Sequence, residues 1–114
     1  QQPVILNMAD FRPVCRIGDH GEGICYLHDN PTPFTTTFYT GSERVFADGI
    51  GVCVVGTLGY ASCGHTTIAT NGSEISVSPD GALHRVGDTG RILEDESGRS
   101  TYVATTGSLF VDSL

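Results

Sequence analysis

The hydrophobic residues of this chain fall in short runs and not at the spacing of an amphipathic helix. The longest apolar runs, such as "ICYL" and "GVCVVG", are far too short to span a bilayer. Threonine and valine are abundant, glycine occurs 15 times, and Asp-Gly turn dipeptides stand at Asp48-Gly49 and Asp80-Gly81. This pattern predicts an all-β protein whose short strands are joined by tight turns.

The chain repeats itself at a constant offset. Gly41-Ser42-Glu43 recurs 31 residues later as Gly72-Ser73-Glu74, and Val55-Gly56 recurs at the same offset as Val86-Gly87. A repeat unit of this length corresponds to a hairpin that cannot bury its hydrophobic face alone, whereas several stacked units can.

Two half-copies at the chain ends complete a third unit. The segment "VCRIGD" places Cys15 where the full copies have Cys53 and His84, and a closing half-copy starts at Gly107-Ser108. We therefore expect one domain over residues 1–114, an all-β, pseudo-threefold β-cone or prism of three hairpin-like repeats. Its N- and C-terminal strands pair, and its termini are adjacent.

Charge and cysteine content restrict the candidate partners and chemistry. The formal net charge is −7, from thirteen acidic residues against six arginines, and the chain has no lysine. This balance argues against nucleic acid and anionic membrane as partners, because both require clustered cations. Four cysteines permit either three alternative pairings into two disulfides or a Cys/His metal site.

Spacing favours a metal site on two of the predicted tip loops, "DHGEGICYLHDNP" and "TLGYASCGHTT". Cys25 and Cys63 each lie seven residues after the glycine of an Ile/Val-Gly motif, and His28 and His65 follow them closely. Two thiolates and two imidazoles suit tetrahedral zinc. The third loop, "DTGRILEDESGRS", offers acids but neither Cys nor His. A disulfide between Cys25 and Cys63 is the alternative.

Other cysteines and histidines have two interpretations each. If Arg85 faces solvent, strand alternation turns His84 inward, either as a ligand replacing one cysteine or as a hydrogen-bonded core residue. His20 is either a further ligand or a solvated loop residue. Cys15 and Cys53 are expected in the core, because a free cysteine packs as a small hydrophobe. Four valines are expected to pack the strand core: Val52, Val55, Val77 and Val86.

The motifs "CRIGD", "GVCVVGT" and "LHRVGD", each associated with a Gly-Ser strand start, resemble the PAAR-repeat proteins over residues 13–114. The family's Pro-Ala-Ala-Arg tetrapeptide is absent, and Val54 and Thr57 stand where the family prefers Arg and Asp. The resemblance implies a β-cone that caps the trimeric spike of a contractile injection machine, such as a phage tail or a type VI secretion system. It also implies an apical zinc held by three histidines and one cysteine, which His28, His65 and His84 with Cys63 or Cys25 would supply.

We therefore expect a structural, zinc-stabilised tip of a membrane-piercing spike, with one zinc per chain held by four of Cys25, His28, Cys63, His65 and His84. The protein is expected to be a monomer whose blunt base binds a trimeric β-helical spike protein, with an effector as a further partner and only transient contact with the target membrane. It would be assembled in the bacterial cytoplasm and reside at a virion tail tip or be secreted by a contractile apparatus. No catalytic constellation stands out, because the Gly-Ser pairs lack a nucleophile elbow and "GDHGEG" lacks a lysine and a following helix. The alternative is a secreted, disulfide-stapled β module that binds carbohydrate or a cell-surface partner.

Overall fold

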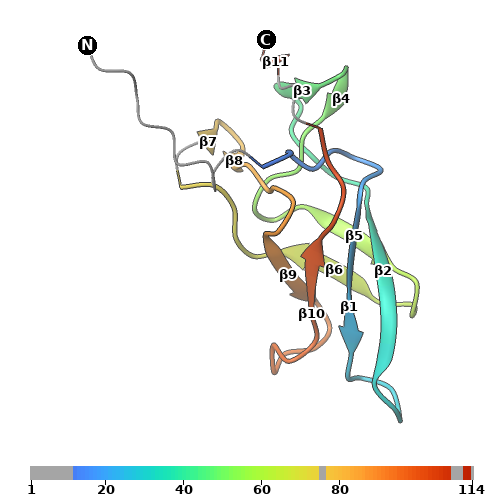
Figure 1. The fold of residues 1–114 in the computed structure, drawn as a ribbon. Helices are drawn as coiled ribbons and strands as arrows, with labels where there is room; N and C mark the ends of the chain where they lie inside the picture. Colours follow the sequence, from blue (N-terminus) through green and yellow to red (C-terminus); the bar gives the residue numbers. More distant parts are fainter. Residues whose placement is uncertain (1–11, 75–76, 109–111, 114) are drawn as a thin grey trace.

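The computed structural model describes residues 12–74, 77–108 and 112–113, and the chain is all-β without a helix throughout these ranges. None of the described segments therefore forms a helix of the length and apolarity that crossing a membrane requires. Six strands close into an antiparallel barrel in the order β1-β10-β9-β6-β5-β2 (Figure 1). They are β1 (His20–Cys25), β2 (Thr32–Phe38), β5 (Leu58–Ala61), β6 (Thr66–Ala69), β9 (Thr89–Ile92) and β10 (Thr101–Ala104). The all-β prediction is confirmed.

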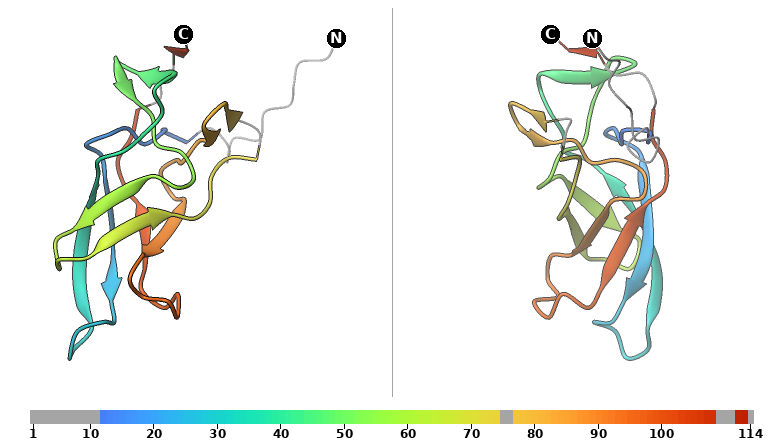
Figure 2. Two further views of the ribbon diagram at one scale, coloured as in Figure 1. Left: turned by 180° about the vertical axis from the view of Figure 1, so that it is seen from behind. Right: turned by 60° about the vertical axis from the view of Figure 1, so that its left-hand side comes forward.

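The barrel consists of three consecutive hairpins, β1–β2, β5–β6 and β9–β10, and short strands occupy the chain between them. One small sheet has the order β11-β3-β4, and β7 pairs with β8 in another. Both small sheets lie at the end of the molecule away from the β1–β2 and β9–β10 loops (Figures 1 and 2). The short strands are β3 (Val45–Ala47), β4 (Ile50–Gly51), β7 (Val77–Ser78), β8 (Gly81–Ala82) and β11 (Asp112–Ser113).

Three barrel strands, β1, β5 and β9, occupy segments that were expected to be tip loops. The residues that follow Gly18, Gly56 and Gly87 enter β1, β5 and β9, so each true loop begins only after that strand. These three glycines have φ angles of 98°, 98° and 91°, a region that side chains disfavour. Each donates its N–H to the last residue of a barrel strand, and the acceptors are the carbonyls of Phe38, Ala69 and Ala104.

A closed ring of backbone hydrogen bonds joins the three Ile/Val-Gly segments. Cys15 donates to the His84 carbonyl at 2.9 Å, His84 donates to the Cys53 carbonyl at 2.9 Å, and Cys53 donates to the Cys15 carbonyl at 2.7 Å. Val14 and Ser108 also exchange two backbone hydrogen bonds, of 2.7 and 2.8 Å, which join two segments that are 94 residues apart in the sequence. The terminal residues themselves lie outside the described residues.

Two hydrophobic clusters pack the part of the chain that the structure describes. The cluster inside the barrel contains Cys15, Cys25, Phe34, Phe38, Cys53, Ala61, Ile92, Tyr102 and Ala104, and the second cluster contains Val14, Val45, Ala47, Val52, Val54 and Leu83. Of the four valines predicted for the core, Val52 is fully buried, but Val55 and Val77 are 38% and 65% exposed. The prediction is wrong for these two because the segments that carry them are short hairpins and bridges at one end of the protein, not core strands.

The ring of Tyr102 fills much of the narrow barrel interior. Tyr102 is 1% exposed, and a Cβ added to Gly90 or Gly21 would collide with its ring. A small barrel is filled by its own side chains, so glycine on the facing strands makes room for one large aromatic residue.

Candidate metal centre

The structure gathers cysteine and histidine side chains from two neighbouring hairpin loops. The ligand atoms of Cys25, His28 and Cys63 all lie within 4.8 Å of one another. The ring of His65 lies beside that of His28, with centroids 5.1 Å apart and planes inclined at 48°. Three of the five predicted ligands therefore form a group that could hold a metal ion, and His65 lies next to its histidine.

Cys25 reaches this place because it is the last residue of β1. It pairs with Thr32 across the hairpin, and its side chain is fully buried in the barrel cluster. The β1–β2 loop (residues 26–31) follows at once and carries His28. The strand thus fixes one thiol at the mouth of the barrel, and the loop returns a histidine to it.

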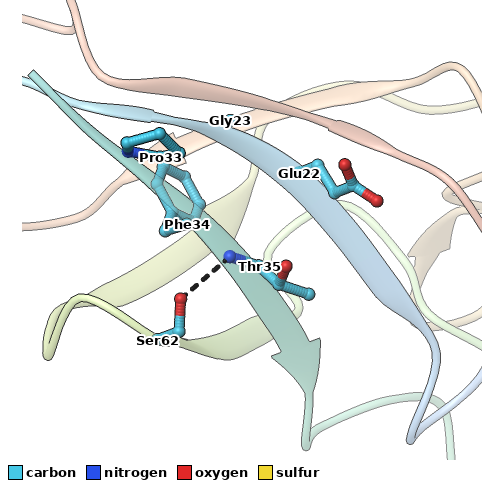
Figure 3. Close-up of a pocket in the computed structure, with 6 residues that line it drawn as sticks. All are labelled: Glu22, Gly23, Pro33, Phe34, Thr35 and Ser62. Carbon is cyan, nitrogen blue, oxygen red and sulfur yellow. Dashed lines mark hydrogen bonds between the residues drawn. The ribbon is translucent and has the colours of Figure 1, made fainter.

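Cys63 is positioned by the tight β5–β6 loop (residues 62–65). Ala61 donates its N–H to the His65 carbonyl at 2.8 Å, and Gly64 donates to the Ala61 carbonyl at 2.9 Å. Ser62 fastens this loop to β2, because its N–H donates to the Thr35 carbonyl at 2.9 Å and its Oγ accepts the Thr35 N–H at 3.0 Å (Figure 3). Cys63 itself packs against the barrel cluster.

The surroundings of Cys63 favour the protonated form of its thiol. Burial raises the pKa of Cys63, and the neighbouring Cys25 raises it further, while the backbone at His65 lowers it in part. All four cysteines of the chain are free thiols in the structure. Metal binding at this place would therefore release protons.

The donors that the structure brings together are the sulfurs of Cys25 and Cys63 and the imidazole of His28. A nitrogen of His65, whose ring lies beside that of His28, would complete the Cys₂His₂ combination that zinc takes in tetrahedral structural sites. An ion held in this way would connect the β1–β2 and β5–β6 loops.

His84 lies apart from this group. Its side chain is fully buried, Nδ1 lies 2.7 Å from the Asn71 carbonyl oxygen, and Nε2 lies 3.0 Å from the Tyr102 hydroxyl. Burial lowers the pKa of His84. Arg85 does not face solvent as assumed, because it is only 7% exposed and its Nε lies 3.3 Å from the Asp88 carboxylate. His84 is thus held by protein hydrogen bonds on both ring nitrogens.

His20, Cys15 and Cys53 also lie elsewhere. His20 is exposed and begins β1, whereas Cys25 ends it. Cys15 and Cys53 are fully buried in the barrel cluster and belong to the backbone ring described above. Burial is the main cause that raises the pKa of Cys15 to about 12, and burial likewise raises the pKa of Cys53 well above the usual range. Both are inert core thiols in this environment.

The third loop (residues 93–100, between β9 and β10) contains a buried carboxylate that the sequence analysis did not single out. Asp95 is only 5% exposed, although it lies in the acidic segment "LEDE" of this loop. Hydrogen bonds from the Ser100 side chain, and then from Ser97, lower the pKa of Asp95. The spacing Asp-x-Ser-x-x-Ser was the available signal, since short polar side chains at such spacings cap one another in turns.

A surface hollow of about 200 Å³ lies beside the β1–β2 hairpin. It is lined by Glu22, Gly23, Pro33, Phe34, Thr35 and Ser62 (Figure 3). Glu22 is the one ionisable side chain among these lining residues, so the hollow brings together no acid–base pair. The hydrogen bond between Thr35 and Ser62 forms part of its wall.

Fold and site together define an all-β protein with a closed six-stranded antiparallel barrel and a Cys/His group that could hold a metal ion. Comparisons with protein-family models, with curated proteins and with solved structures find no match for the chain. The resemblance to PAAR-repeat proteins stays a prediction.

Proposed function

We propose that this protein is the zinc-stabilised tip of a membrane-piercing spike in a contractile injection machine. The observation that carries the proposal is the grouping of Cys25, His28 and Cys63, with His65 beside them, on two loops remote in sequence. One zinc per chain would be held by these four residues. Because four protein ligands leave no open position for water or substrate, its role would be structural.

The work of such an ion would be mechanical. Hairpin loops are costly to order, and an ion that connects two of them removes their freedom. Apparent binding free energies of structural zinc reach about 10–16 kcal/mol in small peptides, far above the contribution of a single hydrogen bond. A spike tip that pierces a membrane must keep its loops rigid, and the ion would supply this rigidity.

We further propose that the three hairpins form a pseudo-threefold cone with adjacent termini. This is supported by the ring through Cys15, Cys53 and His84 and by a second hydrogen bond that recurs in each unit. In the second set, Ser42 donates its N–H to Val52 at 2.7 Å, and the equivalent bonds are those of Ser73 to Leu83 at 2.8 Å and Ser108 to Val14 at 2.8 Å. Three similar units on one chain let a monomer cap a trimer, since each unit can meet one subunit.

The blunt base would be the end with the short sheets β11-β3-β4 and β7-β8, opposite the metal loops (Figure 2). A trimeric β-helical spike protein would bind there, and an effector would be carried on the same assembly. The tip would be assembled in the bacterial cytoplasm and reach the target membrane only during injection.

Three measurements test the proposal. Mass spectrometry under native conditions should find one zinc per chain, and a thiol assay should find thiols that become reactive only after a chelator is added. Pull-down with the spike protein encoded beside this chain should recover a complex of one tip per trimer. A protein without zinc and without free thiols would instead match the secreted, disulfide-stapled β module, and absence of spike binding at micromolar concentration would refute the capping role.

A further inference from the structure

The third loop, which has neither cysteine nor histidine, contacts both metal loops through specific hydrogen bonds. We propose that Glu94 and Asp95 are positioning residues of the metal centre, because they fix the backbone immediately after Cys25 and His65. This inference rests on the proposed metal site. It gives the acidic third loop a function in metal binding although the loop itself contains no cysteine or histidine.

Asp95 organises the third loop from inside. Its Oδ1 accepts hydrogen bonds from the N–H and the hydroxyl of Ser97, at 3.1 and 2.5 Å. Its Oδ2 accepts hydrogen bonds from the N–H of Ser100, at 3.2 Å, and from the Ser100 hydroxyl. A buried carboxylate with four donors is fully satisfied, so the loop holds one conformation without any ion.

Ser100 transmits this order to the first metal loop. Its side chain is fully buried, and its Oγ accepts the N–H of Tyr26 at 2.8 Å. A serine hydroxyl has one proton, and donating it to Asp95 leaves the oxygen lone pairs for Tyr26. Asp95 therefore orients the Ser100 hydroxyl so that its oxygen can accept the N–H of Tyr26. Tyr26 is the residue directly after Cys25, and the Arg99 guanidinium lies 3.9 Å above the Tyr26 ring.

Glu94 makes the corresponding contact to the second metal loop. Both of its carboxylate oxygens accept the N–H of Thr66, at 3.0 and 3.2 Å. Thr66 is the residue directly after His65, and its carbonyl accepts the N–H of Leu93 at 2.7 Å. The third loop thus holds the backbone N–H that directly follows Cys25 and the backbone N–H that directly follows His65.

Because the backbone beside them is already held, the ligands would lose little conformational freedom when they bind the ion. Groups outside the first coordination shell that orient ligands typically account for about 10–100-fold in metal affinity. We therefore expect Asp95→Ala to weaken zinc binding by about 10–100-fold. Ser100→Ala should act in the same direction, since the N–H of Tyr26 loses its acceptor while the side-chain volume barely changes.

The experiment measures zinc affinity of the full chain by competition with a chromophoric chelator, well below the melting temperature. Cobalt substitution adds a readout of ligand geometry, because the visible absorption of thiolate-bound cobalt reports a distorted site. The variants are Asp95→Ala, Ser100→Ala, Glu94→Gln and Glu94→Ala. Glu96→Ala is the matched control, because Glu96 is exposed in the same loop and its removal changes the net charge equally.

The expected result is wild-type affinity and cobalt spectrum for Glu96→Ala, weaker zinc binding for Asp95→Ala and Ser100→Ala, and a smaller loss for Glu94→Gln than for Glu94→Ala. Ser100→Ala keeps the test decisive if Asp95→Ala does not fold. Zinc affinity equal to wild type in Ser100→Ala and both Glu94 variants would overturn the positioning role while leaving the metal site intact. Equal weakening in Glu96→Ala would overturn it in favour of a charge effect. A wild-type protein that binds no zinc would refute the metal site itself.

Discussion

Zinc-dependent stability separates the proposed metal cysteines from the core cysteines. The decisive pair of variants is His65→Ala, which removes a proposed ligand, and Cys53→Ala, which removes a fully buried thiol. An ion that binds only the folded state stabilises it by RT ln(1 + [L]/Kd), about 4.1 kcal/mol at a free zinc concentration 1,000 times Kd. For a domain near 100 residues each kcal/mol raises Tm by about 4 °C, so zinc should raise the wild-type Tm by about 16 °C.

The two variants should divide this effect cleanly. A hundredfold loss of affinity in His65→Ala would remove about 2.8 kcal/mol of the zinc-dependent stabilisation and most of the Tm shift. The zinc-free stability should change little, because the barrel cluster does not include His65. Cys53→Ala should instead keep the full shift and lose about 0.5–1.5 kcal/mol of baseline stability, the range for deleting one buried heavy atom.

The assay is thermal unfolding of each protein in matched buffers containing either a chelator or excess zinc. A Cys53→Ala protein that loses the zinc shift while His65→Ala retains it would refute the reasoning. The metal would then belong to the inward trio Cys15, Cys53 and His84, one level further along the barrel.

Three further outcomes follow from the buried groups and the paired thiols. Tyr102→Phe should cost about 1–3 kcal/mol in chelator-containing urea unfolding, because His84 Nε2 loses its partner; a loss below about 0.5 kcal/mol would contradict this. Because burial lowers the pKa of His84 from 6.5, the folded state releases its proton more readily than the unfolded state, so its contribution to stability is complete above about pH 6.5 and is lost as the pH falls through the folded pKa. An NMR titration should find that the His84 imidazole becomes protonated only at a pH below 6.5. Protonation with a midpoint at 6.5 or above would contradict this. A mild thiol oxidant should couple Cys25 to Cys63 in the metal-free protein and not in the zinc-loaded one, as peptide mapping would show; coupling of the core thiols first would refute it.

The composition and the repeat were sufficient for the fold class but not for the strand positions. Threonine, valine and turn glycines predicted an all-β chain, and the protein is all-β throughout the described residues. The strands β1, β5 and β9 lie in segments interpreted as loops. The next strand after β1, β2 with the sequence "TPFTTTF", alternates buried Phe34, Thr36 and Phe38 with exposed residues. Threonine on both faces hides this alternation from a hydrophobicity pattern, and only the closed barrel shows which threonines are inside.

The candidate metal residues were found through spacing, since equal distances from two repeat glycines put Cys25 and Cys63 at equivalent places. The role of His84 could not be resolved in the same way. Its imidazole is equally compatible with a metal and with hydrogen bonds, and its partners, the Tyr102 hydroxyl and the Asn71 carbonyl, are 18 and 13 residues away. Asp95 was hidden for a similar reason, because three acids in the "LEDE" segment look alike until folding buries one of them.

The three hairpin loops solve one physical problem by two different chemistries. Each loop ends a barrel hairpin and must order its backbone at a cost of about 1–2 kcal/mol per residue. In the third loop Asp95 meets this cost with hydrogen bonds from Ser97 and Ser100, which need no external partner. The β1–β2 and β5–β6 loops lack such a carboxylate and carry Cys-His pairs in its place. At the proposed metal site a single ion would then be sufficient for all three loops, because it would have only two loops to connect and the third already contacts both of them.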